Sequence, residues 1–465
     1  MKIFLIAFVF LFSIQLNAQW SGAILDTLTH NNFKDEVNHQ CLAIDSSDII
    51  HLVYSRVNPS VSWNIFYKKR EANAVWSAEE IVTTQTGFNP VIAASNIAGE
   101  AYVAYEAIDT SDKEIYICSN AGGIWNCFQL TSDTLNDTSP SIAVDSSGFL
   151  HLAWISEKSN GSYKIKYATN LSGTWNVQEL NESQLGQFGS GASPEIAVDK
   201  SGFASIAYRG DYGSGYRIQY AHNQSPGGSL WSYESIATPN DQDLAFAILV
   251  DVDTVVHLLI TGNDGFGLPL RAYYHTKTFS ASTFSPSVEV APAFRGQAGD
   301  IFVDRKKIPH FVLNEVNGNI ITGNIIYANA NEWNGEMLLN SGDVYNANLV
   351  MDSEGRPFLA AYQGNTSADE EVVIFGPGNP VITPAVENIA TPFKIFFSEN
   401  TLIIYFKENY SGRFSCISID GKIVFDKSCN FVKDEIVSTN ALADGVYFLI
   451  SENKLGKFVK KISLK

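Results

Sequence analysis

The sequence is poor in cysteine and has no stretches rich in lysine and glutamate of the kind that form exposed helices. Five cysteines in 465 residues are too few for a disulfide scaffold, and no Cys/His cluster has the spacing of a zinc site. Cys118/Cys127 and Cys416/Cys429 each flank a predicted hairpin, so either pair is a candidate disulfide, with Cys41 left over; spacing alone decides neither. Short apolar runs broken by Gly, Asn, Ser and Asp instead favour an all-β protein.

Long apolar runs are missing as well, apart from one at the N-terminus. Residues 3–12 are apolar, Lys2 precedes them, and Leu16-Asn17-Ala18 offers a small-residue cleavage pattern. This arrangement is typical of a secretory signal, here residues 1–18, and predicts a mature chain beginning at Gln19. The run is too short to span a membrane and no later one approaches twenty residues, so we expect no transmembrane segment in the mature chain.

Basic residues are scarce in most of the chain. Residues 19–379 contain 40 acidic and 19 basic side chains, a net charge of −21, whereas residues 380–465 contain 9 and 11. Such a charge repels polyanions and argues against a nucleic-acid partner. It is compatible with cations, neutral glycans or basic proteins, and equally with a surface that is acidic for solubility.

An internal repeat runs through residues 19–379. Its clearest copy extends from Pro140 to Trp154 and contains the turn Asp145-Ser-Ser-Gly148. Seven copies recur every 48 to 54 residues, and their anchors are Asp45, Ser95, Asp145, Asp199, Asp251, Asp304 and Asp352. Repeats of about fifty residues with four strand signals each predict a seven-bladed β-propeller of four-stranded blades. Six or eight blades, and an open β-solenoid, are the alternatives.

The two ends of the repeat region complement each other. An aromatic residue marks the fourth strand in six copies: Trp76, Trp125, Trp175, Trp231, Phe284 and Trp333. The seventh copy stops near Phe375 without one, while a strand signal with Trp20 precedes the first copy. We therefore predict that the N-terminal strand completes the last blade and closes the ring, which removes exposed edges.

Composition changes after residue 379. Residues 380–388 form a linker punctuated by Pro and Asn, and residues 389–465 contain seven strand signals, which predict a small β-sandwich. Three stretches of this part carry a family resemblance: Asp420-Gly421-Lys422 within residues 415–424, Gly445-Val-Tyr447-Phe, and a closing basic strand with Lys460 and Lys461. They resemble the C-terminal sorting domain of the type IX secretion system of Bacteroidota. The resemblance implies interaction with that secretion machinery, passage across the outer membrane, and release or surface attachment. A generic accessory sandwich is the alternative.

Histidines recur six residues after four of the anchors, at His51, His151, His257 and His310. The equivalent positions elsewhere hold Tyr102, Ser205 and Phe358, so a shared histidine chemistry is excluded. We expect these histidines, and the anchoring aspartates Asp45, Asp145, Asp199, Asp251, Asp304 and Asp352, to be structural. They would pack between blades and hydrogen-bond a neighbouring Asp or backbone group, as in WD-repeat propellers.

Ligand binding is expected in the connections that do not repeat. In a propeller the second-to-third and fourth-to-first connections share one rim, and loops on a rigid scaffold commonly carry function. The richest loop, Arg209 to Arg217, combines aromatic, basic and acidic side chains that suit sugar rings and hydroxyls. The candidate ligand-binding residues are Trp63, Tyr163, Arg209, Asp211, Tyr212, Tyr216, Arg217, Arg271, Phe294, Arg295 and Tyr345.

Motifs for catalysis and metal binding are weak or missing. There is no glycine-rich phosphate loop and no nucleophile elbow, although propeller active sites gather residues from distant blades. The Asp turns are loosely similar to those of sialidase-like propellers, but with two residues rather than one between Asp and Gly. Asp109, Asp112 and Glu114 lack a recognised calcium-loop order, so we expect no cofactor, with Ca²⁺ a weak candidate.

Three functions remain open. We expect an exported module that recognises an extracellular glycan or protein through one rim. A carbohydrate-active enzyme, either a sialidase-like hydrolase or a polysaccharide lyase, is the first alternative, and an adhesion component without a small ligand is the second.

Overall fold

The protein divides into two compact units, Met1–Asn379 and Pro380–Lys465. The structure, a computed structural model, describes residues 24–376 except 29–33, 38, 58–62, 72–75, 110–111, 158–162, 181–192, 212–215, 237–242, 264–269, 318–319, 340–343 and 365–370, together with the strands between 393 and 464. The predicted signal, Trp20 and the linker lie outside the described residues. In the described part, no helix is long and apolar enough to cross a membrane.

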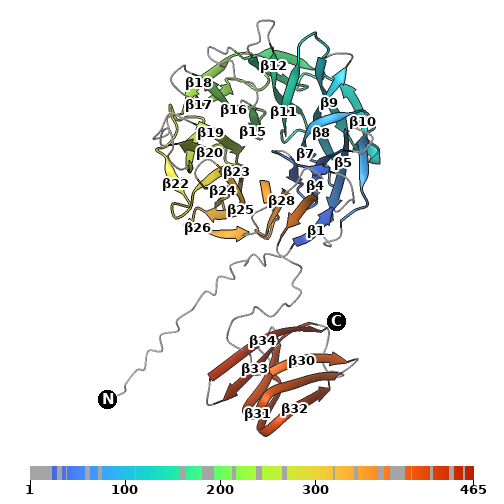
Figure 1. Cartoon of the computed structure of the whole chain (residues 1–465), viewed down its shortest axis with the longest axis vertical. Helices are drawn as coiled ribbons and strands as arrows, with labels where there is room; N and C mark the ends of the chain where they lie inside the picture. Colours follow the sequence, from blue (N-terminus) through green and yellow to red (C-terminus); the bar gives the residue numbers. More distant parts are fainter. Residues whose placement is uncertain are drawn as a thin grey trace, which may run out of the picture. The chain divides into compact units, whose positions relative to one another are not determined.

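Seven antiparallel sheets form a ring around a central channel, with the first strand of each sheet innermost (Figure 1). The predicted seven-bladed propeller is confirmed. Blade 1 comprises β2 (Lys34–Glu36), β3 (Leu42–Ile44), β4 (Ile50–Val57), β5 (Trp63–Arg70) and β6 (Glu80–Thr83). Blade 2 comprises β7 (Gly87–Ala94), β8 (Ala101–Asp109), β9 (Asp112–Ser119) and β10 (Asn126–Gln129). Blade 3 comprises β11 (Asp137–Val144), β12 (Leu150–Glu157), β13 (Tyr163–Thr169) and β14 (Asn176–Glu179). A short 3-10 helix, Ala121–Gly123, joins β9 to β10.

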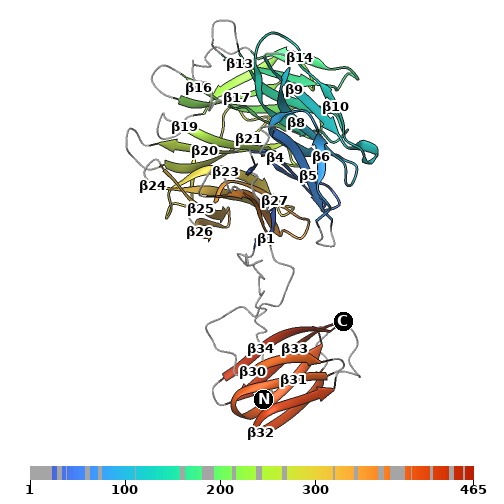
Figure 2. The same cartoon turned by 45° about the vertical axis from the view of Figure 1, so that its right-hand side comes forward.

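The remaining blades repeat the same meander. Blades 4 and 5 comprise β15 (Glu195–Val198), β16 (Ala204–Asp211), β17 (Tyr216–Asn223) and β18 (Trp231–Ser235); and β19 (Asp243–Val250), β20 (Val255–Asn263), β21 (Leu270–Thr278) and β22 (Val288–Val290). Blades 6 and 7 comprise β23 (Gly296–Val303), β24 (Pro309–Asn317), β25 (Ile320–Asn329) and β26 (Glu332–Leu339); and β27 (Val344–Met351), β28 (Pro357–Gln363), β29 (Glu371–Phe375) and β1 (Ile24–Leu28). Figure 2 shows the stacked blades from a second direction.

The ring closes through the N-terminal strand. β1 pairs antiparallel with β29, and Asp26, Thr27 and Leu28 lie opposite Ile374, Val373 and Val372. The fourth strand of blade 7 therefore comes from the other end of the repeat region, as the count of end-of-blade aromatics predicts. One correction concerns blade 1, whose innermost strand is interrupted, so that β2 and β3 pair separately with β4.

The hydrophobic core lies between neighbouring blades. Tyr67 of blade 1 packs in one buried cluster with Val103 and Tyr105 of blade 2. A second cluster joins Leu52 of blade 1 to Ile374 of blade 7 and thus spans the closure. Each blade buries both faces against its neighbours, so the stability of one blade depends on the next.

Within each blade that carries one, the repeated histidine links the Asp turn to the third strand. Asp145 Oδ1 accepts hydrogen bonds from the amides of Ser147 (2.8 Å) and Phe149 (3.0 Å), and Gly148 takes the left-handed conformation at φ 87°. His151 Nδ1 lies 2.7 Å from the Tyr167 hydroxyl and its Nε2 lies 3.6 Å from Asp145 Oδ2. The same arrangement of buried histidine, tyrosine and aspartate occurs at His51, His257 and His310.

The end-of-blade aromatics complete this arrangement. Trp125 and Trp231 meet Tyr67 and Tyr167 of the preceding blades edge to face, with ring centroids 5.0 Å apart. Edge-to-face contacts of this kind stabilise aromatic pairs beyond the area they bury. The residues that repeat in the sequence are thus those that hold one blade to the next.

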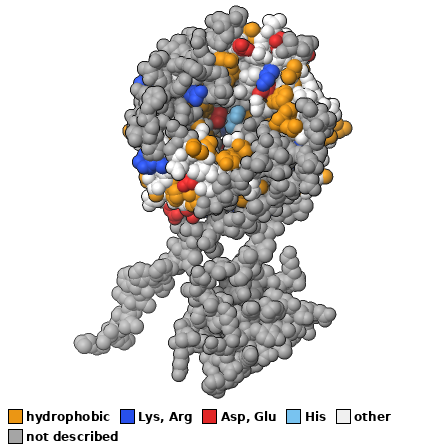
Figure 3. Space-filling view, viewed as in Figure 1, with side chains coloured by type: hydrophobic (Ala, Val, Ile, Leu, Met, Phe, Trp, Pro, Cys, Tyr) orange, Lys and Arg blue, Asp and Glu red, His pale blue; other side chains and the backbone are white. Residues whose placement is uncertain are grey.

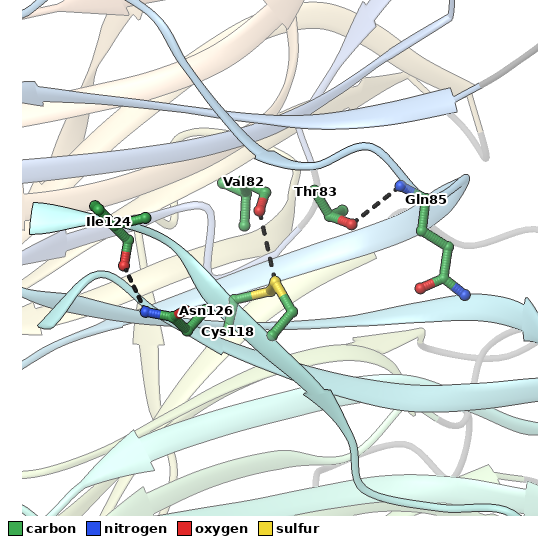
Figure 4. Close-up of a disulfide and its surroundings, with 7 residues drawn as sticks. Val82, Thr83, Gln85, Cys118, Ile124 and Asn126 are labelled. Carbon is green, nitrogen blue, oxygen red and sulfur yellow. Dashed lines mark hydrogen bonds between the residues drawn. A yellow bond between two sulfur atoms is a disulfide. The ribbon is translucent and has the colours of Figure 1, made fainter.

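A disulfide joins Cys118 of β9 to Cys127 of β10, residues that lie opposite each other in the strand pairing. It crosslinks the outermost strand of blade 2 near Val82 and Thr83 of blade 1 (Figure 4). Cys41 is free and buried. In the second unit the strand register places Cys416 opposite Phe425 and Cys429 opposite Gly412.

The second unit is a five-stranded antiparallel sheet. Its strands are β30 (Phe393–Ser398), β31 (Thr401–Ser418), β32 (Ile423–Ser438), β33 (Gly445–Asn453) and β34 (Gly456–Leu464), in the order β30-β31-β33-β34 with β32 against β31. The sequence predicts seven strands here, which is wrong. β31 and β32 each join two of the predicted strands, and their pairing shifts register between Tyr405 and Gly412.

Candidate functional site

The innermost strands are irregular at one end of the channel. Register shifts interrupt β7, β11, β19, β23 and β27 close to their first residues. Non-glycine residues with positive φ occur at three of these points, Asn89 (50°), Ser139 (53°) and Asn346 (54°), and at Gln40 (54°) between β2 and β3 of blade 1. Such conformations are costly outside glycine, and bulges redirect neighbouring side chains. The chain thus accepts local strain around the channel mouth.

A cavity of about 320 Å³ lies at this end of the channel. Its walls come from blades 1, 4, 5, 6 and 7, and its lining residues are His39, Ser193, Glu195, Ala245, Phe246, Gln297, Ala298, Gly299, Asn314, Ile321, Asn346, Ala347 and Asn348. Asn314 is near the end of β24 and Ile321 near the start of β25. The cavity therefore opens on the rim that carries the second-to-third connections. Figure 3 shows acidic and histidine side chains in the hollow at the centre of the ring.

Side chains four residues before the anchors link the innermost strands of successive blades. Each accepts a main-chain N–H from the next blade: Ser141 from Ile196 (2.9 Å), Glu195 from Ile248 (3.1 Å), Asp300 from Leu349 (2.8 Å) and Asn348 from Cys41 (3.2 Å). Neutral serine and asparagine make this contact as carboxylates do. The contact itself therefore does not account for an acid in two of these positions.

Both acids have altered ionisation. Burial, reinforced by the nearby Asp300 carboxylate, raises the pKa of Glu195 well above its ordinary value. Burial likewise raises the pKa of Asp300 to about 7, against the opposing effect of two backbone hydrogen bonds. The charged form of each acid is costly in this environment because the described lining offers no counter-charge.

Two other groups in the lining are buried acceptors without partners. The ring of His39 bonds the Pro140 backbone, and burial lowers its pKa to about 4, so it is neutral. Its Nε2 is buried and has no hydrogen-bond partner among the described residues, and the same holds for Oδ1 of Asn314, a residue only 5% exposed. Unpaired buried polar atoms are rare in native proteins and costly. The described lining contains no lysine or arginine.

Replacing Asp300 by Asn is expected to change how stability depends on pH. The folded-state pKa of about 7 exceeds the ordinary value of 3.8, so folded Asp300 holds its proton between these values while the unfolded residue loses it. Ionisation therefore destabilises the native state as the pH rises through 7. As the pH rises from 5 to 8.5, we expect the free energy of unfolding of Asp300→Asn to increase by about 2 kcal/mol relative to that of the parent. This value allows for screening of the charge by water in the channel. Urea unfolding at both pH values measures it.

The reciprocal change provides the control for this prediction. Asn348→Asp places an acid at the equivalent position of blade 7, and we expect it to make the loss of stability with rising pH steeper. An offset of equal size at pH 5 and pH 8.5 for Asp300→Asn would show that Asp300 ionises normally.

The predicted rim residues lie elsewhere, and none of those described lines the cavity. Trp63 packs against Phe88 (ring centroids 6.0 Å apart), Tyr345 stacks on Tyr362 (5.3 Å), and Tyr163 packs on the core between blades 3 and 4. Arg271 pairs with Glu289, and Arg295 donates to the Phe294 carbonyl. Arg209 and Arg217 lie on β16 and β17. Asp211 and Tyr216 are backbone-paired residues at the ends of these strands, and Tyr212 lies outside the described residues.

The acids considered for calcium have other partners. Asp109 accepts a hydrogen bond from Gln129, and Glu114 accepts one from Thr131. Over the described residues, no three His, Cys, Asp or Glu side chains are placed to hold a metal ion.

Sequence reasoning missed the cavity for an identifiable reason. Its key residue, Glu195, lies inside the repeat rather than in a variable loop. Aligning the seven copies four residues before each anchor would have exposed it, because the column reads Cys41, Val91, Ser141, Glu195, Ala247, Asp300 and Asn348. Two acids in an otherwise neutral or apolar column are the available signal.

The C-terminal unit and the propeller have known counterparts. Residues 398–465 match the family described as the secretion system C-terminal sorting domain. Within it, Gly445 and Tyr447 lie on β33, and Lys460 and Lys461 pair with Leu449 and Phe448. Asp420, Gly421 and Lys422 lie outside the described residues. A search among curated proteins finds no matching sequence.

Several solved structures are similar in fold. A fungal alcohol oxidase of the AA5 family, solved with copper, has a TM-score of 0.50 at 11% identity over 94% of this chain and 100% of that chain. The polysaccharide lyase Uly1 has 0.47 at 10% over 73% and 90%, and Trypanosoma rangeli sialidase has 0.45 at 10% over 94% and 86%. At these identities the likenesses concern the fold alone. The protein is thus a seven-bladed β-propeller with a type IX secretion sorting domain, which directs its export to the cell surface or the extracellular space.

Proposed function

We propose that the propeller is a recognition module that binds a glycan at the mouth of its central channel. The observation that carries this proposal is the polar cavity, whose lining residues His39 and Asn314 each have a buried acceptor with no partner among the described residues. Sugar hydroxyls donate hydrogen bonds to such acceptors, and Phe246 offers an apolar surface in the same wall. Ser193 and Gln297 supply donors for hydroxyl oxygens.

Recognition is favoured over glycoside hydrolysis by the state of the two acids. Hydrolases of this kind use a pair of carboxyl groups on either side of the scissile bond. Asp300 accepts backbone N–H groups at both oxygens, from Ile301 and Leu349, and does not line the cavity. Glu195 is therefore the one carboxyl group of the described lining that can meet a substrate.

A glycan array probed with the mature chain tests the proposal, followed by calorimetry of the sugars that bind. Ser193→Trp fills the cavity and is expected to reduce affinity at least tenfold, whereas Trp63→Ala and Arg271→Ala, on the third strands of blades 1 and 5 and outside the lining, leave it within about twofold. Loss of binding in the rim variants but not in Ser193→Trp would place the ligand on the loops. A uniformly silent array would favour an adhesion component, and turnover of a bound polysaccharide would favour an enzyme.

A further inference from the structure

The cavity has an imbalance between hydrogen-bond acceptors and positive charge. Three residues of its lining carry acceptors: His39 and Asn314, whose Nε2 and Oδ1 atoms are buried and have no partner among the described residues, and Glu195, whose Oε2 accepts the Ile248 amide. Glu195 is partly accessible from the cavity, and the described lining has no cationic side chain to balance it. The described lining therefore provides no counter-charge for an ionised Glu195 carboxylate.

From this imbalance, and on the basis of the proposed function, we infer that the channel site recognises a protonated amino group on a sugar ring, as in glycans that contain free glucosamine. An ammonium group has three N–H donors and no acceptor, which suits a described lining that has acceptors and no cationic side chain. A hydroxyl group has one donor and two lone pairs, and it leaves the carboxyl group of Glu195 without a counter-charge.

The neighbourhood of the site favours a cation as well. Asp300 follows the lining residue Gly299 and adds negative potential when ionised. The net charge of −21 on residues 19–379 attracts cationic ligands and repels uronic, sialylated or sulfated glycans. The described lining offers an anionic sugar no lysine or arginine, and Arg271 and Arg56 outside it are paired with Glu289 and Glu79.

The size of the cavity limits what enters it. At about 320 Å³ it is at the small end of ligand pockets, which span roughly 300–1,000 Å³. One or two sugar rings fit such a volume, so the site would hold the end of a chain rather than its middle. The polar side chains Ser193, Gln297 and Asn346 in the same lining are available to the ring hydroxyls.

Calorimetry with a matched series of disaccharides tests the inference on the mature chain at pH 6.5. The series is the glucosamine disaccharide, its N,N′-diacetyl form and cellobiose, which differ at the carbon that carries the amine. We expect the free amine to bind at least tenfold tighter than the other two. Binding should also release protons, detected as a dependence of the heat on the ionisation enthalpy of the buffer, because a bound cation favours ionised Glu195.

Glu195→Gln separates charge from packing. The amide keeps an acceptor for Ile248, so the fold is retained, and we expect the preference for the amine to fall below about twofold while cellobiose binding is unchanged. Glu354→Gln, an exposed acid on the Asp turn at the other end of the channel, is the matched control and should keep the full preference. An unchanged thermal transition of Glu195→Gln confirms folding.

The outcomes distinguish the two proposals. Equal affinity for amine and cellobiose, abolished by Ser193→Trp, would overturn the amine preference and leave a glycan site in the channel. An equally tight lysine amide would overturn the assignment to a sugar amine. Absence of binding by every disaccharide would overturn both this inference and the proposed function.

Discussion

A chain that begins at residue 29 rather than 19 is expected to unfold roughly 10 °C below the mature protein. The shortened chain lacks β1, which pairs with β29 through Ile24, Asp26, Thr27 and Leu28. At about 1 kcal/mol for each hydrogen bond, the ladder alone contributes about 4 kcal/mol, and Val372 and Ile374 of the clusters that span the closure lose the strand beside them. The unpaired edge of β29 would also promote association between chains.

Thermal unfolding followed by circular dichroism measures this loss, and size-exclusion chromatography measures association. Addition of a peptide of residues 19–28 in excess should restore part of the transition temperature, because the peptide can pair with β29. A second control is a chain of residues 19–379, which lacks the separate C-terminal unit and should keep the parent transition. An unchanged transition in the chain from residue 29 would show that β1 contributes nothing to closure.

This closure was predictable from the sequence because it follows from counting. Strand signals and end-of-blade aromatics repeat at a fixed spacing, so a missing fourth strand at one end and a surplus strand at the other are visible without a structure. The Asp turns were predictable for the same reason, since an aspartate side chain that accepts the turn amides, as Asp145 does, recurs at a fixed position in the repeat.

The channel site was not predictable by the same route. His39, Glu195 and Asn314 come from blades 1, 4 and 6, and no spacing rule connects them. The backbone around them contains register shifts and positive φ angles at residues such as Gln40 and Asn346. A glycine usually indicates a positive φ in a sequence, and neither position is glycine. The expectation of ligand binding in variable loops points instead to residues such as Tyr345 and Arg271, which do not line the cavity.

The second unit shows a different limit. The polar run at Lys407, Glu408 and Asn409 separates two apolar stretches and predicts a loop, yet the structure continues β31 through it with a shift in register. The strand stays extended through this run, and its pairing with β32 resumes at Tyr410 after the register shift. The motif nevertheless identified the domain, because Gly445, Tyr447 and the terminal lysines are local in sequence.

Deletion of residues 389–465 is expected to abolish delivery of the propeller beyond the outer membrane of the host. The deleted part contains the whole match to the sorting family, residues 398–465, and forms a unit separate from the propeller. Because the two units are separate, the truncated protein should fold in the periplasm and accumulate there in soluble form. Cell fractionation with immunoblotting of periplasm, outer membrane and medium measures its distribution.

Two constructions separate a sorting defect from a folding defect. Periplasmic truncated protein should unfold at the same temperature as purified residues 19–379, which shows that the propeller is intact but retained. Fusion of residues 389–465 to a periplasmic reporter should carry the reporter to the surface or the medium. Delivery of the truncated propeller, or retention of the fused reporter, would mean that the address lies elsewhere in the chain. The expected pair of results would show that residues 389–465 are both necessary and sufficient for export, and that the propeller is exported without contributing to sorting.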